Sequence, residues 1–296
     1  MGDDGTGTAI SKVFAAHANF AARVFGESYA VRPVSFTHTT NDSPKRLLRP
    51  ALAREFVYVG LFYGLYWLVR NRQGTDVQAT QQAFTNAKRI IRLEKFLGIF
   101  QEESIQKAFL GSRLLIQSLN TYYGTMHFLV TIAAMLWCFQ RLPERYPSIR
   151  NGLAFMTGMA LFGFAFFPLM PPRLMPVPQW NFVDTLKDFG GPWSFHSGPI
   201  SKVSNQFAAM PSLHFGWSSW CATTFWPWAR SIWRKLLLLA YPALTLFAIV
   251  VTANHWFLDA VGGLFVFALG MWLGKRLDES QWLKRARKRR TAEPVS

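Results

Sequence analysis

Long apolar stretches, each close to the length of a membrane-spanning helix, recur from residue 51 onwards in this 296-residue chain. A helix needs about 20 predominantly apolar residues to cross the hydrocarbon core of a bilayer. Six stretches approach that length, at 51–69, 121–139, 153–170, 207–226, 236–252 and 256–274. Arg54 and Glu55 interrupt the first stretch, and we expect them at the membrane interface. The pattern predicts an all-α fold, a polytopic transmembrane bundle of about six spans.

The segments around these stretches define the remaining organisation. Residues 1–50 are predicted to form a polar N-terminal tail, because they lack the apolar core of a secretory signal. Residues 51–275 form the predicted transmembrane catalytic domain. Within it, the amphipathic pattern of residues 77–118 predicts interfacial helices that lie along the membrane surface. Residues 276–296 are predicted to form a basic C-terminal tail.

The charge balance changes the picture only by giving an orientation. The net charge is +16, yet no nucleic-acid-binding motif accompanies it, so membrane lipids rather than nucleic acid are the expected partners. Lys and Arg gather in segments that six spans would place on one side, which predicts that side, with both termini, to be cytosolic. The segment 70–120 breaks this pattern with Lys88, Arg89, Arg92 and Lys95, and its amphipathic sequence indicates that it lies along the membrane surface instead. The opposite end of the bundle then faces the extracytoplasmic or luminal space.

Two short histidine motifs stand at the ends of apolar stretches. One runs from Met210 to His214, and the other runs from Asn254 through His255 to Asp259. An aspartate inside a bilayer costs about 2.5–3.5 kcal/mol, so it calls for a partner or a function. His255 and Asp259 are four residues apart, which places both side chains on one face of a helix. This spacing indicates a carboxylate that orients an imidazole.

The predicted spans bring the candidate residues to one membrane face. Arg173 follows the third span, His214 begins the fourth and His255 begins the sixth. The set fits phosphoryl transfer, with His255 as nucleophile, Asp259 as its orienting group and His214 as general acid. Arg173 and Lys202 would neutralise phosphate oxygens, with a further hydroxyl donor from Ser212. No cofactor is expected, because phosphohistidine chemistry needs no divalent metal.

A metal site is the rival use of the same side chains. Two histidines and one carboxylate could hold zinc or iron. The chain has no H-E-x-x-H motif and no Asp-rich cluster, and its two cysteines, Cys138 and Cys221, fall in separate spans. The anion-site interpretation is therefore preferred over a metal site.

The paired motifs resemble the second and third signature motifs of the type 2 phosphatidic acid phosphatase superfamily, which includes vanadium haloperoxidases. The sequence of residues 205–216 is similar to that of the inositolphosphotransferase branch, which contains the inositol phosphorylceramide (aureobasidin-resistance) synthases. Residues 94–102, 120–127 and 254–263 are similar to that branch too. The resemblance implies the same roles as the residue chemistry: His255 as nucleophile, Asp259 as orienter and His214 as acid.

The chain departs from the superfamily pattern at two positions. Phe166 stands at the spacing of the usual first-motif lysine, and Ile249 stands where an arginine usually precedes the nucleophile by six residues. Other groups must then meet the phosphate charge, for which the candidates are Lys202, Asn205, Gln206 and Asn254. These departures weaken a simple phosphatidate-phosphatase assignment.

Three functions remain open at this point. The first is an inositol-phosphate-type lipid phosphotransferase with an alcohol acceptor, and the second is a lipid phosphate or prenyl diphosphate phosphatase with water as acceptor. The third is a non-catalytic lipid-binding or transport protein. Among the other polar residues, His127 is interpreted as an interfacial histidine, and Asp184 and Asp188 as solvated loop residues. His196 could equally contact substrate or lie in a solvated loop.

Overall fold

The computed structural model of the chain describes residues 55, 57, 58, 60, 61 and 64, and the stretches 77–190 and 206–292. The predicted N-terminal tail and most of the first apolar stretch lie outside these residues. The helices are α3 (Val77–Phe96), α4 (Glu102–Phe109), α5 (Arg113–Arg141), α6 (Tyr146–Phe166), α7 (Thr185–Asp188), α8 (Leu213–Phe225), α9 (Ile232–Val251) and α10 (Phe257–Ala292), with short 3-10 turns η1 (Pro172–Leu174) and η2 (Trp226–Trp228).

The all-α fold class is confirmed. Within the described stretches the only extended pairing is an isolated bridge between Leu169 and Ala208, and no strand forms. Four described helices, α5, α6, α9 and α10, are long and apolar enough to cross a membrane. The chain is therefore an integral membrane protein.

The fourth predicted span, 207–226, is shorter in the structure than the sequence indicated. Its helix, α8, begins only at Leu213 and has 13 residues, which rise about 20 Å against a hydrocarbon core of about 30 Å. Residues before Leu213 form an irregular segment in which Ser212 caps the helix with its side chain. The hydropathy of this region cannot distinguish apolar loop from apolar helix, so the predicted number of six spans is not confirmed.

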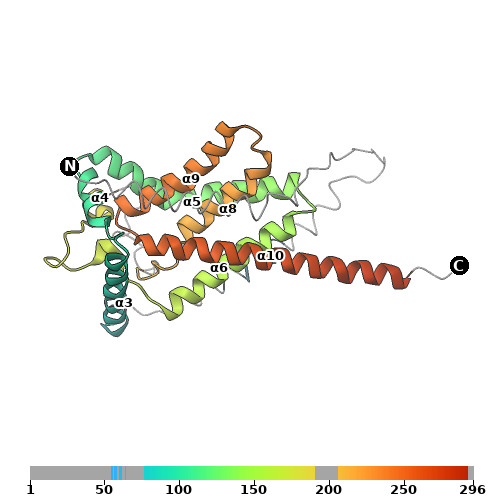
Figure 1. Cartoon of the computed structure of the whole chain (residues 1–296), viewed down its shortest axis with the longest axis horizontal. Helices are drawn as coiled ribbons and strands as arrows, with labels where there is room; N and C mark the ends of the chain where they lie inside the picture. The colour runs from blue at the N-terminus through green and yellow to red at the C-terminus, as the bar shows by residue number, and fades with distance from the viewer. Residues whose placement is uncertain are drawn as a thin grey trace.

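Helices α5, α6, α8, α9 and α10 run along the long axis of the molecule, and α3 lies across one end of them (Figure 1). Helix α4 lies at the same end. This arrangement is the one expected of interfacial helices, although α5 already begins at Arg113 and takes up the last residues of the predicted 77–118 segment. The position of α3 and α4 at a membrane surface stays a prediction.

Helices α6 and α10 pack antiparallel along a seam of small residues. A Cβ atom added to Gly270 would lie 2.7 Å from the Met156 backbone nitrogen and 2.8 Å from the Gly152 oxygen. Gly274, one turn further along α10, has equally close backbone neighbours at Gly152 and Ser148. Small residues four apart let two membrane helices approach to backbone contact. This seam fixes the axis of α10, on which the candidate site depends.

Of the two charged residues in the first apolar stretch, Arg54 and Glu55, the structure describes Glu55 and shows its partners. Glu55 forms an ion pair with Arg150 of α6, and its other oxygen accepts a hydrogen bond from the Tyr146 hydroxyl at 3.1 Å. The carboxylate therefore has partners within the protein at the start of α6, which reduces the cost of its position in an apolar segment.

We expect Gly270→Ala to destabilise the protein by about 1–3 kcal/mol, because the added methyl group meets backbone atoms that cannot move aside. Thermal unfolding of the detergent-solubilised protein measures this loss. Gly158→Ala is the matched control, since a Cβ atom on this glycine of α6 meets nothing within 4 Å. Equal melting temperatures for the two variants would contradict the close α6–α10 contact.

Candidate active site

A tight turn between α9 and α10 delivers His255. Helix α9 ends at Val251, and Ala253 takes the left-handed conformation with φ 53°. The backbone N–H groups of Asn254 and His255 then both donate to the Ile249 oxygen, at 2.9 and 3.2 Å. A left-handed residue other than glycine costs roughly 1–2 kcal/mol, and such strain persists where the surrounding structure requires it. The turn places the histidine immediately before α10.

The partners of His255 determine which ring nitrogen carries the proton. Its Nδ1 lies 2.9 Å from the Ala209 carbonyl oxygen and 3.2 Å from Asp259 Oδ2. Both partners are acceptors when Asp259 is ionised, so Nδ1 must be the donor. Within the described part of the chain, Nε2 is buried and has no hydrogen-bond partner. The neutral ring therefore presents a lone pair on Nε2.

Asp259 joins three parts of the site. Its Oδ2 accepts a second hydrogen bond from the Trp256 N–H at 2.9 Å, which closes the first turn of α10. Its backbone oxygen accepts the Ser212 N–H at 2.8 Å and links α10 to the start of α8. The side chain is 0% exposed. The i, i+4 pairing predicted from the sequence is present.

The start of α8 reaches α10 through a glycine contact. A Cβ atom added to Gly263 would overlap the carbonyl oxygen of Ser212. The Ser212 hydroxyl oxygen accepts the Phe215 N–H at 3.4 Å and caps α8, while its own hydrogen can still be donated. His214 therefore lies in the first turn of α8, directly beside the first turns of α10.

Four rings from three segments gather at this end of the bundle. The ring centroids of His214 and His255 are 5.5 Å apart, and Tyr123 of α5 stacks on His214 at 4.2 Å. The ring of His127, also on α5, lies 4.1 Å from that of His214. His127, interpreted from the sequence as an interfacial histidine, has its side chain in this cluster. Its spacing of four residues from Tyr123, on one helix face, was the available signal.

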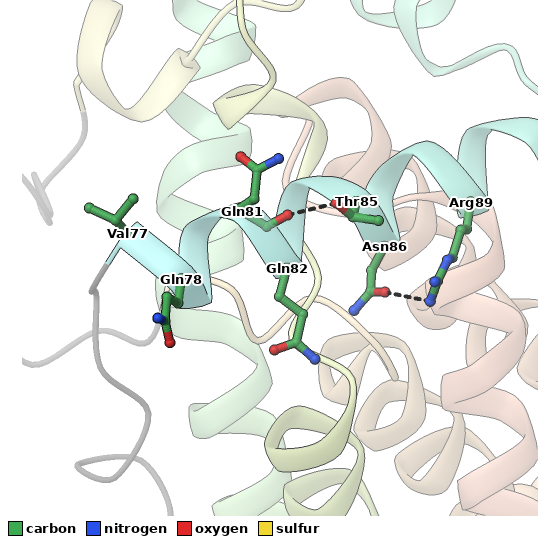
Figure 2. Close-up of a pocket in the computed structure, with 7 residues that line it drawn as sticks. All are labelled: Val77, Gln78, Gln81, Gln82, Thr85, Asn86 and Arg89. Atoms are coloured by element: carbon green, nitrogen blue, oxygen red, sulfur yellow. Dashed lines mark hydrogen bonds between the residues drawn. The ribbon is translucent and has the colours of Figure 1, made fainter.

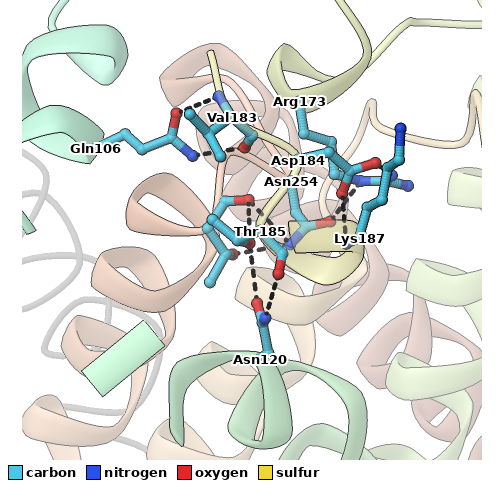
Figure 3. A network of polar contacts seen from close by, with 9 residues as sticks. Gln106, Asn120, Arg173, Val183, Asp184, Thr185, Lys187 and Asn254 are labelled. Atoms are coloured by element: carbon cyan, nitrogen blue, oxygen red, sulfur yellow. Dashed lines mark hydrogen bonds and ion pairs between the residues drawn. The ribbon is translucent and has the colours of Figure 1, made fainter. Parts of the chain in front are cut away.

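Arg173 lies against the turn that carries the nucleophile candidate. Its Nε donates to Asn254 Oδ1 at 3.0 Å, and its Nη1 forms an ion pair with Asp184 Oδ2 at 3.1 Å (Figure 3). Its backbone N–H also donates to the Ala253 oxygen at 2.8 Å. Asp184 was expected in a solvated loop. Instead it is only 13% exposed and orients the arginine.

The loop that carries Asp184 is fixed to the bundle by polar contacts (Figure 3). Asn120 of α5 donates to the carbonyl oxygens of Thr185 and Gly190, both at 2.9 Å, and accepts from the Thr185 hydroxyl. Gln106 of α4 exchanges two hydrogen bonds with the Val183 backbone. Arg173 is thus oriented by a braced segment rather than by a loose one.

The other phosphate-binding candidates fare differently. Asn254 is buried and bonded to Arg173, and Gln206 is partly buried at the start of the segment that leads to Ser212. Lys202 and Asn205 lie outside the described residues, and so does His196. The structure therefore brings together Arg173, Asn254, His255, Asp259, Ser212 and His214 at one end of the bundle.

One hollow of the described surface lies away from the histidine motifs. A cavity of about 550 Å³ runs along α3 and is lined by Val77, Gln78, Gln81, Gln82, Thr85, Asn86 and Arg89 (Figure 2). None of the histidine-motif residues lines it. Among the described side chains, no group of three or more His, Cys, Asp or Glu residues is arranged to hold a metal ion.

The fold and this site define a class: an all-α integral membrane protein with an aspartate-oriented histidine at one end of its bundle. A family model described as the PAP2 superfamily matches residues 88–273, more than half of the chain and the part that contains every one of these site residues. The chain belongs to the PAP2 superfamily. No curated protein and no solved structure matches it. Membership supports a phosphatase- or phosphotransferase-type enzyme that acts on membrane lipids.

Proposed function

We propose that this protein transfers a phosphate-containing group between lipids through a phosphohistidine intermediate on His255, without a metal ion. One observation carries the proposal: both partners of His255 Nδ1 are acceptors, so Nε2 holds the lone pair that a nucleophile needs. The buried Asp259 carboxylate would stabilise the positive ring that forms when Nε2 bonds to phosphorus.

In the first half-reaction, His255 Nε2 attacks phosphorus and the bond from phosphorus to the leaving alcohol oxygen breaks. His214, protonated in the complex with the phosphate anion, donates its proton to that oxygen and becomes neutral. The His214 and His255 ring centroids are 5.5 Å apart, close enough for both rings to act on one phosphoryl group. Tyr123 and His127, which contact His214, would hold its ring for this transfer.

In the second half-reaction, neutral His214 takes the proton of an acceptor hydroxyl, the acceptor oxygen bonds to phosphorus and the N–P bond breaks. With a lipid alcohol the enzyme is a transferase, and with water it is a hydrolase. The deep burial of His255 and Asp259, 3% and 0% exposed, supports the transferase because it limits the access of water. The resemblance of residues 205–216 supports an inositol-phosphate-type group as the one transferred.

Arg173 is the proposed phosphate anchor, with Asn254 and Ser212 as further donors. A guanidinium has five N–H groups. Two of them are committed to Asn254 and Asp184, so the remainder are available to phosphate oxygens. Gln206, Lys202 and Asn205 are proposed to complete the anion site.

The proposed location of the site is the extracytoplasmic or luminal face, with cytosolic termini. The exposed or half-exposed cations Arg141, Arg145, Arg230, Arg234 and Lys235 all lie at the opposite end of the spans, where α5 meets α6 and α8 meets α9. An excess of basic residues in the connections between spans marks the cytosolic side of a membrane protein. The exposed cations of α3, among them Lys88, Arg89 and Arg92, lie at the site end, and the proposal assigns them to a helix along the membrane surface rather than to a connection between spans.

We expect His255→Ala to abolish turnover, a loss of at least about 10⁴-fold, because no other group can form the covalent intermediate. Detergent-purified protein is incubated with phosphatidylinositol or phosphatidate, with and without a lipid alcohol, and with EDTA. Lys187→Ala, at an exposed residue of the same face, is the control and should retain activity.

Each outcome of this assay decides between functions. A new phospholipid that forms only with the alcohol supports the transferase. Inositol phosphate from phosphatidylinositol, or inorganic phosphate from phosphatidate, without any acceptor product supports the hydrolase. Inhibition by EDTA contradicts the metal-independent mechanism. An active His255→Ala variant contradicts both enzyme functions and favours the lipid-binding alternative.

We expect Arg173→Ala to weaken the binding of orthovanadate, a phosphate mimic, by about tenfold or more, since a charge-assisted hydrogen bond contributes roughly 1.5–3 kcal/mol. Calorimetric titration of the purified protein measures this affinity. Lys187→Ala removes the same formal charge from the neighbouring exposed position and should change the affinity by less than about twofold. Equal losses in the two variants would show that only overall charge matters.

The orientation is testable with single cysteines, because both native cysteines are buried. We expect a membrane-impermeant maleimide to label Lys187→Cys in intact cells, or in sealed vesicles that expose the luminal side. Glu144→Cys, in the exposed turn between α5 and α6, should react only after permeabilisation. The reverse pattern would place the site on the cytosolic face.

A further inference from the structure

Three buried carboxyl groups bind the three N–H groups that open α10. The Trp256 N–H donates to Asp259 at 2.9 Å, the Phe257 N–H to Glu102 Oε1 at 2.9 Å, and the Leu258 N–H to Glu94 Oε1 at 2.8 Å. The first N–H groups of a helix have no partner within the helix itself. The two glutamates therefore do for α10 what a capping residue does locally, but from other helices.

These glutamates come from α3 and α4, which lie across the end of the bundle (Figure 1). Gly98 ends α3 with φ +70°, and the Ile99 N–H donates back to the Glu94 oxygen at 2.9 Å. This turn brings two side chains eight residues apart to the same point. Both glutamates are 0% exposed, which is costly for carboxyl groups unless a specific contact repays it.

At neutral pH, Glu94 and Glu102 together carry one negative charge rather than two. Burial, together with the nearby charges of Glu102 and Asp259, raises the pKa of Glu94 to about 10. Burial also raises the pKa of Glu102, although that carboxyl accepts two backbone N–H groups, from Phe257 and Gln101, which favour its ionised form. Glu94 therefore holds a proton at neutral pH. No ion pair among the described residues includes either glutamate.

We propose that Glu94 and Glu102 are positioning residues for the nucleophile: with Asp259 they fix the first turn of α10, and so His255, against the two helices at the end of the bundle. The inference rests on the proposed function only for its catalytic consequence. Neither glutamate touches the reacting atoms, since their bonds run to the backbone of residues 257 and 258.

Length and charge can be separated at position 94. Glu94→Gln keeps the acceptor oxygen at the same reach and copies the protonated carboxyl, so we expect kcat within about threefold of wild type. Glu94→Asp keeps the acid but is one methylene shorter and cannot reach the Leu258 N–H. We expect it to lower kcat by about tenfold or more with little change in KM, because a misplaced nucleophile acts in the transition state. A purely electrostatic role predicts the opposite order.

A second readout needs no substrate. Hydrogen exchange of the peptide that contains residues 256–258, followed by mass spectrometry on the full chain, should be faster in Glu94→Asp and unchanged in Glu94→Gln. Glu103→Ala is the matched control, because Glu103 of α4 bonds to Asn181 at 2.9 Å and not to α10. It should leave both the exchange and kcat as they are.

The shared proton gives a pH signature with a defined sign. The folded protein binds this proton up to about pH 10, whereas an unfolded glutamate releases it near its ordinary pKa of 4.5. The folded state thus binds more protons in this window, and this group makes the protein less stable as the pH rises. The titratable groups that face the pair are Asp259 of α10 and, beyond it, His255 in the turn before α10. Glu94→Gln removes the titration, so its melting temperature should fall less between pH 6 and 9 than that of wild type.

The outcomes separate this inference from the proposed function. If the wild-type protein shows no turnover that depends on His255, the proposed function is overturned. The hydrogen-exchange data then decide alone whether the glutamates hold α10. Turnover in wild type with unchanged kcat and unchanged exchange in Glu94→Asp overturns the positioning role. If Glu94→Asp does not fold, Glu102→Asp tests the effect of a shorter side chain at the Phe257 N–H.

Discussion

The need to satisfy the first N–H groups of α10 inside the protein governs the structure around the site. A buried backbone donor without a partner costs several kcal/mol in an apolar environment. Asp259, Glu102 and Glu94 meet this need for Trp256, Phe257 and Leu258. Because Asp259 uses the same oxygen for Trp256 and for His255, the cap of the helix and the orientation of the imidazole are one arrangement.

The same turn of α10 also determines where the second histidine lies. The Ser212 N–H donates to the backbone carbonyl oxygen of Asp259. The absence of a side chain at Gly263 lets the Ser212 carbonyl group approach α10. His214 follows two residues after Ser212 and is placed by this contact. The glycine seam between α6 and α10 holds the axis of the helix from the other side. Both histidines are therefore positioned by contacts to one helix, α10.

The parts of this arrangement that depend on local pattern were predictable from the sequence. Hydropathy locates four helices of membrane-spanning length, and a spacing of four places Asp259 beside His255. The parts that depend on tertiary contact were not. Helix α8 is shortened by the irregular segment before Leu213, and Asp184 is drawn to Arg173 by charge. Glu94 and Glu102 have the sequence context of surface residues, and only the packing of α3 and α4 on α10 buries them.

The distribution of charge constrains how the described part of the site can hold a phosphate. Asp184 neutralises Arg173, and the proton on Glu94 limits the negative charge that accumulates behind His255. The described groups therefore offer an incoming phosphate little net positive charge. They offer oriented donors instead: the uncommitted N–H groups of Arg173 and the Ser212 hydroxyl. Donors fixed before the substrate arrives stabilise developing charge without reorganising, which is more effective in a buried site than in water. The bracing of the Arg173 loop by Asn120 and Gln106 thus belongs to the proposed chemistry as much as to the fold.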